Sequence, residues 1–114
     1  MAHLMQIKAI VYYNGASERE SARLWLAKKI SSIQKFQKYE PIKIINNKND
    51  ICYEFYNGDT WRCVNANEMA RGYRTDIAYY SSTIPDDIFY TIIKPKNIRG
   101  LRICQKIYLN NEEN

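Results

Sequence analysis

The sequence predicts a small α/β protein, with a mixed sheet of central parallel strands plus an antiparallel hairpin, and two main helices. Short β-branched and aromatic segments alternate along the chain with two segments of helical periodicity, the pattern of strands joined by crossover helices. Asn57 and Gly58 separate two strand-like segments, and this dipeptide is a strong hairpin signal. The 114 residues suit a single domain, 1–114, with flexible tails expected at 1–4 and 110–114.

The first part of the chain predicts a strand, a helix and a second strand. Met5 to Tyr13 is apolar and β-branched enough for an inner strand. Ser17 and Glu20 have the spacing of a capping box, which predicts a helix that begins there and ends near Lys38. Ile42 to Asn47 predicts a short strand. Apolar residues at helical spacing define the face that the helix should bury: Ala22, Trp25, Leu26, Ile30 and Ile33.

The hairpin lies within 51–64, and its turn chemistry predicts a register. A two-residue type I′ loop at Asn-Gly would place Phe55 opposite Thr60 and Cys52 opposite Cys63. We therefore expect these two thiols to be near each other without forming a disulfide. A β-bulge would shift this register.

The last part of the chain predicts a strand, a second helix and a final element. Asp76 to Tyr80 has the composition of a strand. Thr83 is the candidate N-cap of a helix with Pro85 in its first turn and Pro95 at its end. The segment 97–109 fits either a strand or a helix, and we favour a strand.

Charge favours an acidic partner. The chain has 17 Lys and Arg against 12 Asp and Glu, a formal net charge of +5, and it has ten Tyr. A basic, Tyr-rich surface suits nucleic acid, DNA or RNA, by charge and by stacking on bases. The alternative is a compositional bias toward Lys, Asn and Ile that gives a basic protein without such a function. The sequence lacks an apolar run of membrane-spanning length and a secretion signal, so we expect no membrane partner and a cytoplasmic protein.

The sequence gives little support for catalysis. Three Cys and one His do not supply the ligands of a zinc site. A phosphate-binding loop needs the pattern G-x-x-x-x-G-K-[ST], whereas Gly15 is followed by the acids Glu18 and Glu20. We therefore expect no cofactor, no metal and no enzymatic activity.

Three segments resemble parts of phage large terminase subunits, the DNA-packaging ATPases. They are "YEFYNGDTWRCVNA", "ARGYR" and "DIAYY", within 51–95 and under half of the chain. In that family the strand after the RG segment, the Walker B strand, ends in Asp-Glu, which hold magnesium and the catalytic water. Here Ser81 and Ser82 take those positions, and hydroxyls cannot replace two carboxylates in that role. The resemblance implies a small phage protein with ATPase-like architecture and no hydrolysis.

Arginine and aromatic residues interleave around the central segment. As candidates for contact with nucleic acid or a protein partner we take Trp61, Arg62, Arg71, Tyr73, Arg74 and Arg99. The structural alternative is that Arg71 and Arg74 cap backbone carbonyls and pair with nearby aspartates.

Three functions stay open. The first is a non-enzymatic binding protein with nucleic acid as its ligand. The second is an inhibitor or accessory subunit that docks on a host or packaging protein, and the third is a degenerate P-loop ATPase-like domain. Edge strands of the hairpin could also pair across a homodimer.

Overall fold

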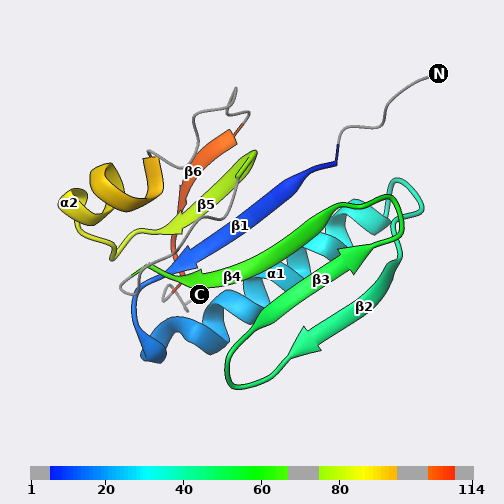
Figure 1. The fold of residues 1–114 in the computed structure, drawn as a ribbon, viewed down its shortest axis with the longest axis horizontal. Helices are drawn as coiled ribbons and strands as arrows, with labels where there is room; N and C mark the ends of the chain where they lie inside the picture. Colours follow the sequence, from blue (N-terminus) through cyan, green and yellow to red (C-terminus); the bar gives the residue numbers. More distant parts are fainter. Residues whose placement is uncertain (1–5, 67–74, 95–102, 110–114) are drawn as a thin grey trace.

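The computed structural model describes residues 6–66, 75–94 and 103–109, which form a six-stranded mixed sheet with helices on both faces (Figure 1). The sheet order is β2-β3-β4-β1-β5-β6. Strands β4, β1, β5 and β6 are parallel, and β3 runs antiparallel between β2 and β4. The predicted α/β class is therefore confirmed. The strands are β1 (Lys8–Tyr13), β2 (Pro41–Asn46), β3 (Ile51–Phe55), β4 (Thr60–Asn65), β5 (Ile77–Ser81) and β6 (Ile103–Ile107).

Helix α1 (Arg19–Gln34) covers one face of the sheet, and it runs behind β4 and β3 in Figure 1. The other face packs against the short helix α2 (Asp86–Ile88) and the π-helical turn η2 (Phe89–Ile93) that continues it. Strand β1 supplies both cores, because successive side chains of a strand point to opposite faces. Val11 lies in the α1 core, and the next residue, Tyr12, lies in the α2 core.

The expected apolar face of α1 is confirmed, but the expected capping box is wrong. A 3₁₀ turn, η1 (Ala16–Glu18), precedes the helix, and Glu18 stands at the N-cap without a side-chain cap hydrogen bond. Glu20 pairs with Arg23 one turn later instead of reaching back to Ser17. The helix also ends at Gln34 rather than Lys38. The Gln34 side-chain amide donates to the Tyr39 carbonyl oxygen (2.7 Å) and draws the following turn against the helix end.

The second helix begins later than the sequence predicts. Pro85 is extended (φ −64°, ψ 153°) and occupies the N-cap position of α2, so Thr83 is not the cap. The Thr83 hydroxyl instead donates to the Glu18 Oε2 atom over 2.8 Å. The predicted end at Pro95 lies outside the described residues. In the segment 97–109, the favoured strand is confirmed as β6, parallel to β5.

The hairpin exists, but its register differs by one residue from the prediction. Ile51 lies opposite Cys63 and Cys52 lies opposite Arg62, so the two thiols are on opposite faces of the sheet and are not a cross-strand pair. The loop has three residues, with Gly58 N–H bonded to the Phe55 carbonyl (2.9 Å). Gly58 has φ +94°, and no described non-glycine residue, Asn57 included, has a positive φ, so this is not the type I′ loop.

Tertiary contacts explain the longer hairpin loop. The Asn57 Oδ1 atom accepts the Asp59 N–H (3.0 Å), which fixes Asn57 in an Asx-type turn. The Asp59 carboxylate in turn accepts the Ile7 N–H (2.8 Å) and the Tyr39 hydroxyl (2.5 Å). These bonds hold the hairpin turn against the start of β1 and the chain before β2. The sheet edge on this side is β2, and the hairpin strand β3 is internal.

Candidate functional site

The carboxyl ends of the parallel strands form the edge of the sheet where ligands usually bind in open α/β folds. Tyr13 at the end of β1 is in register with Asn65 at the end of β4, and β5 ends nearby at Ser81. The loop that joins β1 to α1 crosses this edge. We call the contacts among this loop, Ser81 and Thr83 the Glu18 cluster, because that side chain is at its centre.

Glu18 is a buried carboxylate that other groups of the protein surround. Its exposed fraction is 2%, and that of Ser81 is 0%. The Oε2 atom accepts hydrogen bonds from the hydroxyls of Ser81 (3.0 Å) and Thr83 (2.8 Å), and the Oε1 atom accepts the Asn14 N–H (2.8 Å). Glu18 thereby joins the first helix of the chain to the end of β5, and the side chain is held in one position.

Two further backbone donors of the loop are also occupied. The Gly15 N–H donates to the Asn65 Oδ1 atom (3.1 Å), and the Glu18 N–H donates to the Gly15 carbonyl (3.1 Å). The Asn14 side-chain amide reaches the Thr83 carbonyl over 3.0 Å. In a phosphate-binding loop, backbone N–H groups at this place turn toward phosphate oxygens. Here a carboxylate and an amide oxygen of the protein already accept the N–H groups of Asn14 and Gly15.

This chemistry does not fit a nucleotide with magnesium. Glu18 brings a buried negative charge to the position where a phosphate would need positive charge and free donors. The strand end offers the hydroxyls of Ser81 and Thr83, both bonded to that carboxylate, rather than a pair of acids. Among the described residues, no group of three or more His, Cys, Asp or Glu could hold a metal ion.

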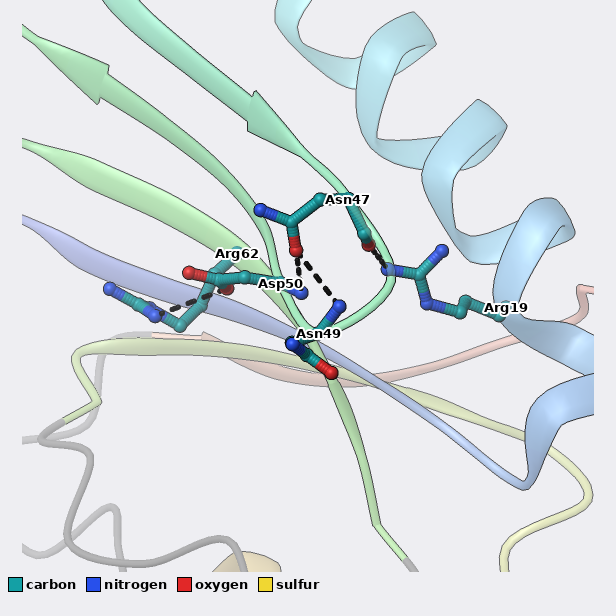
Figure 2. Close-up of polar contacts among 5 residues, drawn as sticks. All are labelled: Arg19, Asn47, Asn49, Asp50 and Arg62. Carbon is teal, nitrogen blue, oxygen red and sulfur yellow. Dashed lines mark hydrogen bonds and ion pairs between the residues drawn. The ribbon is translucent and has the colours of Figure 1, made fainter.

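A second set of polar residues lies beside the Glu18 cluster, around the β2–β3 turn (Figure 2). Arg19, the first residue of α1, donates to the Asn47 carbonyl, and the Asn47 Oδ1 atom accepts the N–H groups of Asn49 (2.8 Å) and Asp50 (2.9 Å). On the other side of the turn, Arg62 of β4 approaches Asp50 with an N–O distance of 3.6 Å. Two arginines therefore flank one tight turn.

The structure separates the two neighbouring site candidates of β4. Trp61 lies in the core beneath α1 with an exposed fraction of 4%. Its indole N–H donates to the Tyr39 hydroxyl (3.0 Å), which itself donates to Asp59. The side chain therefore belongs to the network that holds the hairpin turn, and it takes no part in the surface.

Arg62 points to the opposite face of the sheet and keeps an exposed fraction of 21% at its side chain. Its contact with Asp50 offsets part of its charge. The other candidate residues lie outside the described part of the chain: Arg71, Tyr73, Arg74 and Arg99. The expected capping and ion-pair contacts of Arg71 and Arg74 therefore also lie outside it. Their role stays a prediction.

The cysteines have the properties of structural thiols. Burial raises the pKa of the Cys63 thiol to about 12, although Arg19 and Arg23 act in the opposite direction. Burial also raises the pKa of Cys52 and of Cys104. A nucleophilic cysteine needs a lowered pKa, so these groups are unsuited to covalent catalysis. In the described ranges, no helix is long and apolar enough to cross a membrane.

Sequence reasoning missed Glu18 as a structural centre and treated it only as an obstacle to phosphate. One signal was available, because an acid just after the first strand and hydroxyl residues at the end of a later strand are complementary hydrogen-bonding groups. Sequence alone could not show that the ends of β1 and β5 are adjacent.

Comparison with known proteins gives a likeness in fold. No protein-family model matches the sequence, and no curated protein matches it. Among solved structures, a mutant of the large terminase ATPase domain of Thermus phage P74-26 matches with a TM-score of 0.55 and 11% sequence identity. The match covers 88% of this chain and 47% of that one, so this chain spans about half of the length of the terminase domain. The fold is thus terminase-ATPase-like.

Proposed function

We propose that this protein is a non-hydrolytic relative, in fold, of a terminase ATPase domain, and that it works as a binding protein. The observation that carries the proposal is the buried Glu18 carboxylate, which accepts the Asn14 N–H and the Ser81 and Thr83 hydroxyls. A phosphate there would have to displace a charge-assisted set of hydrogen bonds and approach a negative charge.

The effect of nucleotide on the melting temperature tests the claim that the protein neither binds nor hydrolyses nucleotide. A ligand that binds only the folded state raises the melting temperature in proportion to the logarithm of its concentration above its Kd. We expect millimolar ATP or ADP with magnesium to leave the melting temperature unchanged, and we expect no metal-dependent ATP turnover. A concentration-dependent rise in melting temperature, or turnover abolished by substitution of Ser81, would overturn the proposal.

Nucleic acid is the first ligand that we propose, and the charge of α1 and the turn after it supports this choice. Residues 16–38 contain six of the 17 basic residues and two of the 12 acids, so they carry most of the net charge. Among the described residues, neither Lys28 nor Lys35 forms an ion pair, and both line a shallow hollow on the outer face of α1. The remaining lining residues are Leu24, Ala27, Ser31 and Ser32.

Salt dependence is the direct test for nucleic acid. Each lysine that neutralises a phosphate of a single strand contributes about 0.7 to the slope of log K against log salt. We expect Lys28→Gln with Lys35→Gln to weaken binding of a labelled single-stranded oligonucleotide and to reduce this slope by about 1.4. Lys106→Gln, an exposed residue of β6, is the matched control. Arg62→Gln tests, in the same assay, whether the face of β4 that carries Arg62 also contacts the oligonucleotide.

The second candidate function is docking on a protein, and one observation favours it. The large exposed hydrophobic residues include Ile42 (68%) and Ile44 (56%) on β2, an edge strand. An exposed edge with apolar side chains is a template for pairing with another chain. Absence of oligonucleotide binding at low salt would favour this function over nucleic acid.

A further inference from the structure

Strand β2 is an unpaired edge with an apolar surface. It pairs with β3 on one side and ends the sheet on the other, so backbone N–H and C=O groups along its outer side have no strand partner among the described residues. Ile42 and Ile44 are more than half exposed on it. Tyr56, 70% exposed, lies next to this edge, because Pro41 at the start of β2 is opposite Phe55.

We propose that two copies of this chain pair antiparallel through β2, so that their sheets become one continuous sheet about a two-fold axis. Such an interface is isologous, and each residue contact occurs twice. In a continuous antiparallel sheet, directly opposite residues share a face. The axis must therefore lie midway between one residue of β2 and the same residue of the second copy, which leaves a small number of registers.

Charge selects among these registers. An axis at Lys43 would place two lysines directly opposite each other, which is destabilising. An axis at Ile44 pairs that residue with Ile44 of the second copy and sets Lys43 opposite Ile45. It also brings Glu40 toward Lys48 of the second copy at both ends of the paired segment. The register at Ile44 is thus complementary in both apolar contact and charge.

Two features of β2 limit the strength of this pairing. Lysine on an edge strand and a β-bulge are both devices that discourage association. The bulge lies between Pro41 and Lys43, so the regular part of the strand is short. Lys43 faces Glu54 across the β2–β3 pair, which places an opposite charge next to it. The interface is small, so we expect a weak dimer that forms with rising concentration rather than a permanent one.

Sedimentation velocity of the full chain over a wide concentration range tests the proposal. We expect a monomer–dimer equilibrium. Ile44→Lys puts like charges on the axis and should weaken association at least about tenfold. Leu24→Lys, a comparably exposed residue of α1, is the control and should leave it unchanged. A monomer at every concentration, or a dimer that Ile44→Lys does not weaken, would contradict the proposal.

A charge exchange then tests the register. Glu40→Lys alone and Lys48→Glu alone should each weaken the dimer, because like charges then meet at both ends. The double variant should restore association, because the pairs re-form with their charges reversed. Failure of the double variant to recover would overturn the Ile44 register. This proposal does not depend on nucleic-acid binding, since β2 and the outer face of α1 are separate surfaces.

Discussion

The Ser81 hydroxyl donates a hydrogen bond of 3.0 Å to the Glu18 Oε2 atom, and the two residues are 63 positions apart in the sequence. This bond joins the end of β5 to the loop after β1. In a phosphate-binding fold the same place belongs to the ligand. Here the protein supplies both the anion, the Glu18 carboxylate, and the hydrogen-bond donors that surround it.

Removal of the Glu18 carboxylate should destabilise the protein. In Glu18→Ala, the Ser81 and Thr83 hydroxyls and the Asn14 N–H lose an acceptor, and buried unsatisfied groups cost about 1–3 kcal/mol each. We expect the free energy of unfolding, measured with urea, to fall by at least about 2 kcal/mol.

Two further variants calibrate the Glu18 measurement. Glu18→Gln should cost less than Glu18→Ala, because an amide keeps one acceptor oxygen and its N–H groups can donate to hydroxyl oxygens. Glu20→Ala, two residues along, removes an exposed carboxylate and should leave the unfolding midpoint almost unchanged. Equal losses for Glu18→Ala and Glu20→Ala would show that the cluster does not stabilise the fold.

The Tyr39 hydroxyl should matter more than that of another tyrosine near the hairpin turn. It donates to Asp59 (2.5 Å) and accepts the Trp61 indole N–H (3.0 Å). Tyr39→Phe therefore leaves the buried indole N–H without its acceptor and removes one donor from the buried Asp59 carboxylate. We expect a loss of about 2 kcal/mol in the free energy of unfolding. Tyr56→Phe, where the side chain is 70% exposed, is the matched control and should be neutral.

Gly58 should resist substitution because of its backbone conformation. Its φ of +94° is unfavourable for residues with a Cβ, and a Cβ there would lie 2.5 Å from the Gln6 Nε2 atom. We expect Gly58→Ala to lower the free energy of unfolding by about 1–2 kcal/mol. Gly58→Asn has a similar Cβ but tolerates positive φ better, so it should cost less. Equal costs would indicate that contact with Gln6, not φ, dominates.

Stability should fall in mild alkali because of Cys63. Burial raises its pKa to about 12 in the folded protein, whereas an unfolded thiol titrates at about 8.5. Between these values the unfolded chain has lost a proton that the folded chain retains, so raising the pH favours unfolding. The contribution of this thiol is complete below about pH 8.5 and decreases by about 1.4 kcal/mol per pH unit within the window.

Urea titrations between about pH 9 and pH 10 test this thiol when two proteins are compared, because tyrosines, which titrate near pH 10, contribute equally to both. Cys63→Ala should have a shallower dependence of unfolding free energy on pH than the unsubstituted protein, whatever its absolute stability. Cys52 and Cys104, whose pKa values are also raised by burial, contribute to both proteins and cancel in the comparison. Parallel pH profiles would contradict the assignment.

Local patterns in the sequence determined most of the secondary structure. Apolar, β-branched and aromatic composition predicted β1 and β5, and the spacing of Ala22, Leu26 and Ile30 predicted the buried face of α1. These patterns depend on which side chains leave water, and that is encoded within a few residues. The sequence also shows that two serines, Ser81 and Ser82, rather than acids, stand at the end of the predicted strand that became β5.

Only the tertiary structure decided the hairpin register, the place of Trp61 and the partners of Glu18. Asn57 and Gly58 suit a two-residue loop locally, but the bonds of Asp59 to Ile7 and Tyr39 accompany a three-residue loop. An aromatic residue beside an arginine fits a surface or a core equally well, and packing against α1 decides for Trp61. Glu18 meets Ser81 because β1 and β5 are parallel neighbours. Each outcome depends on contacts between residues distant in sequence, which local patterns do not contain.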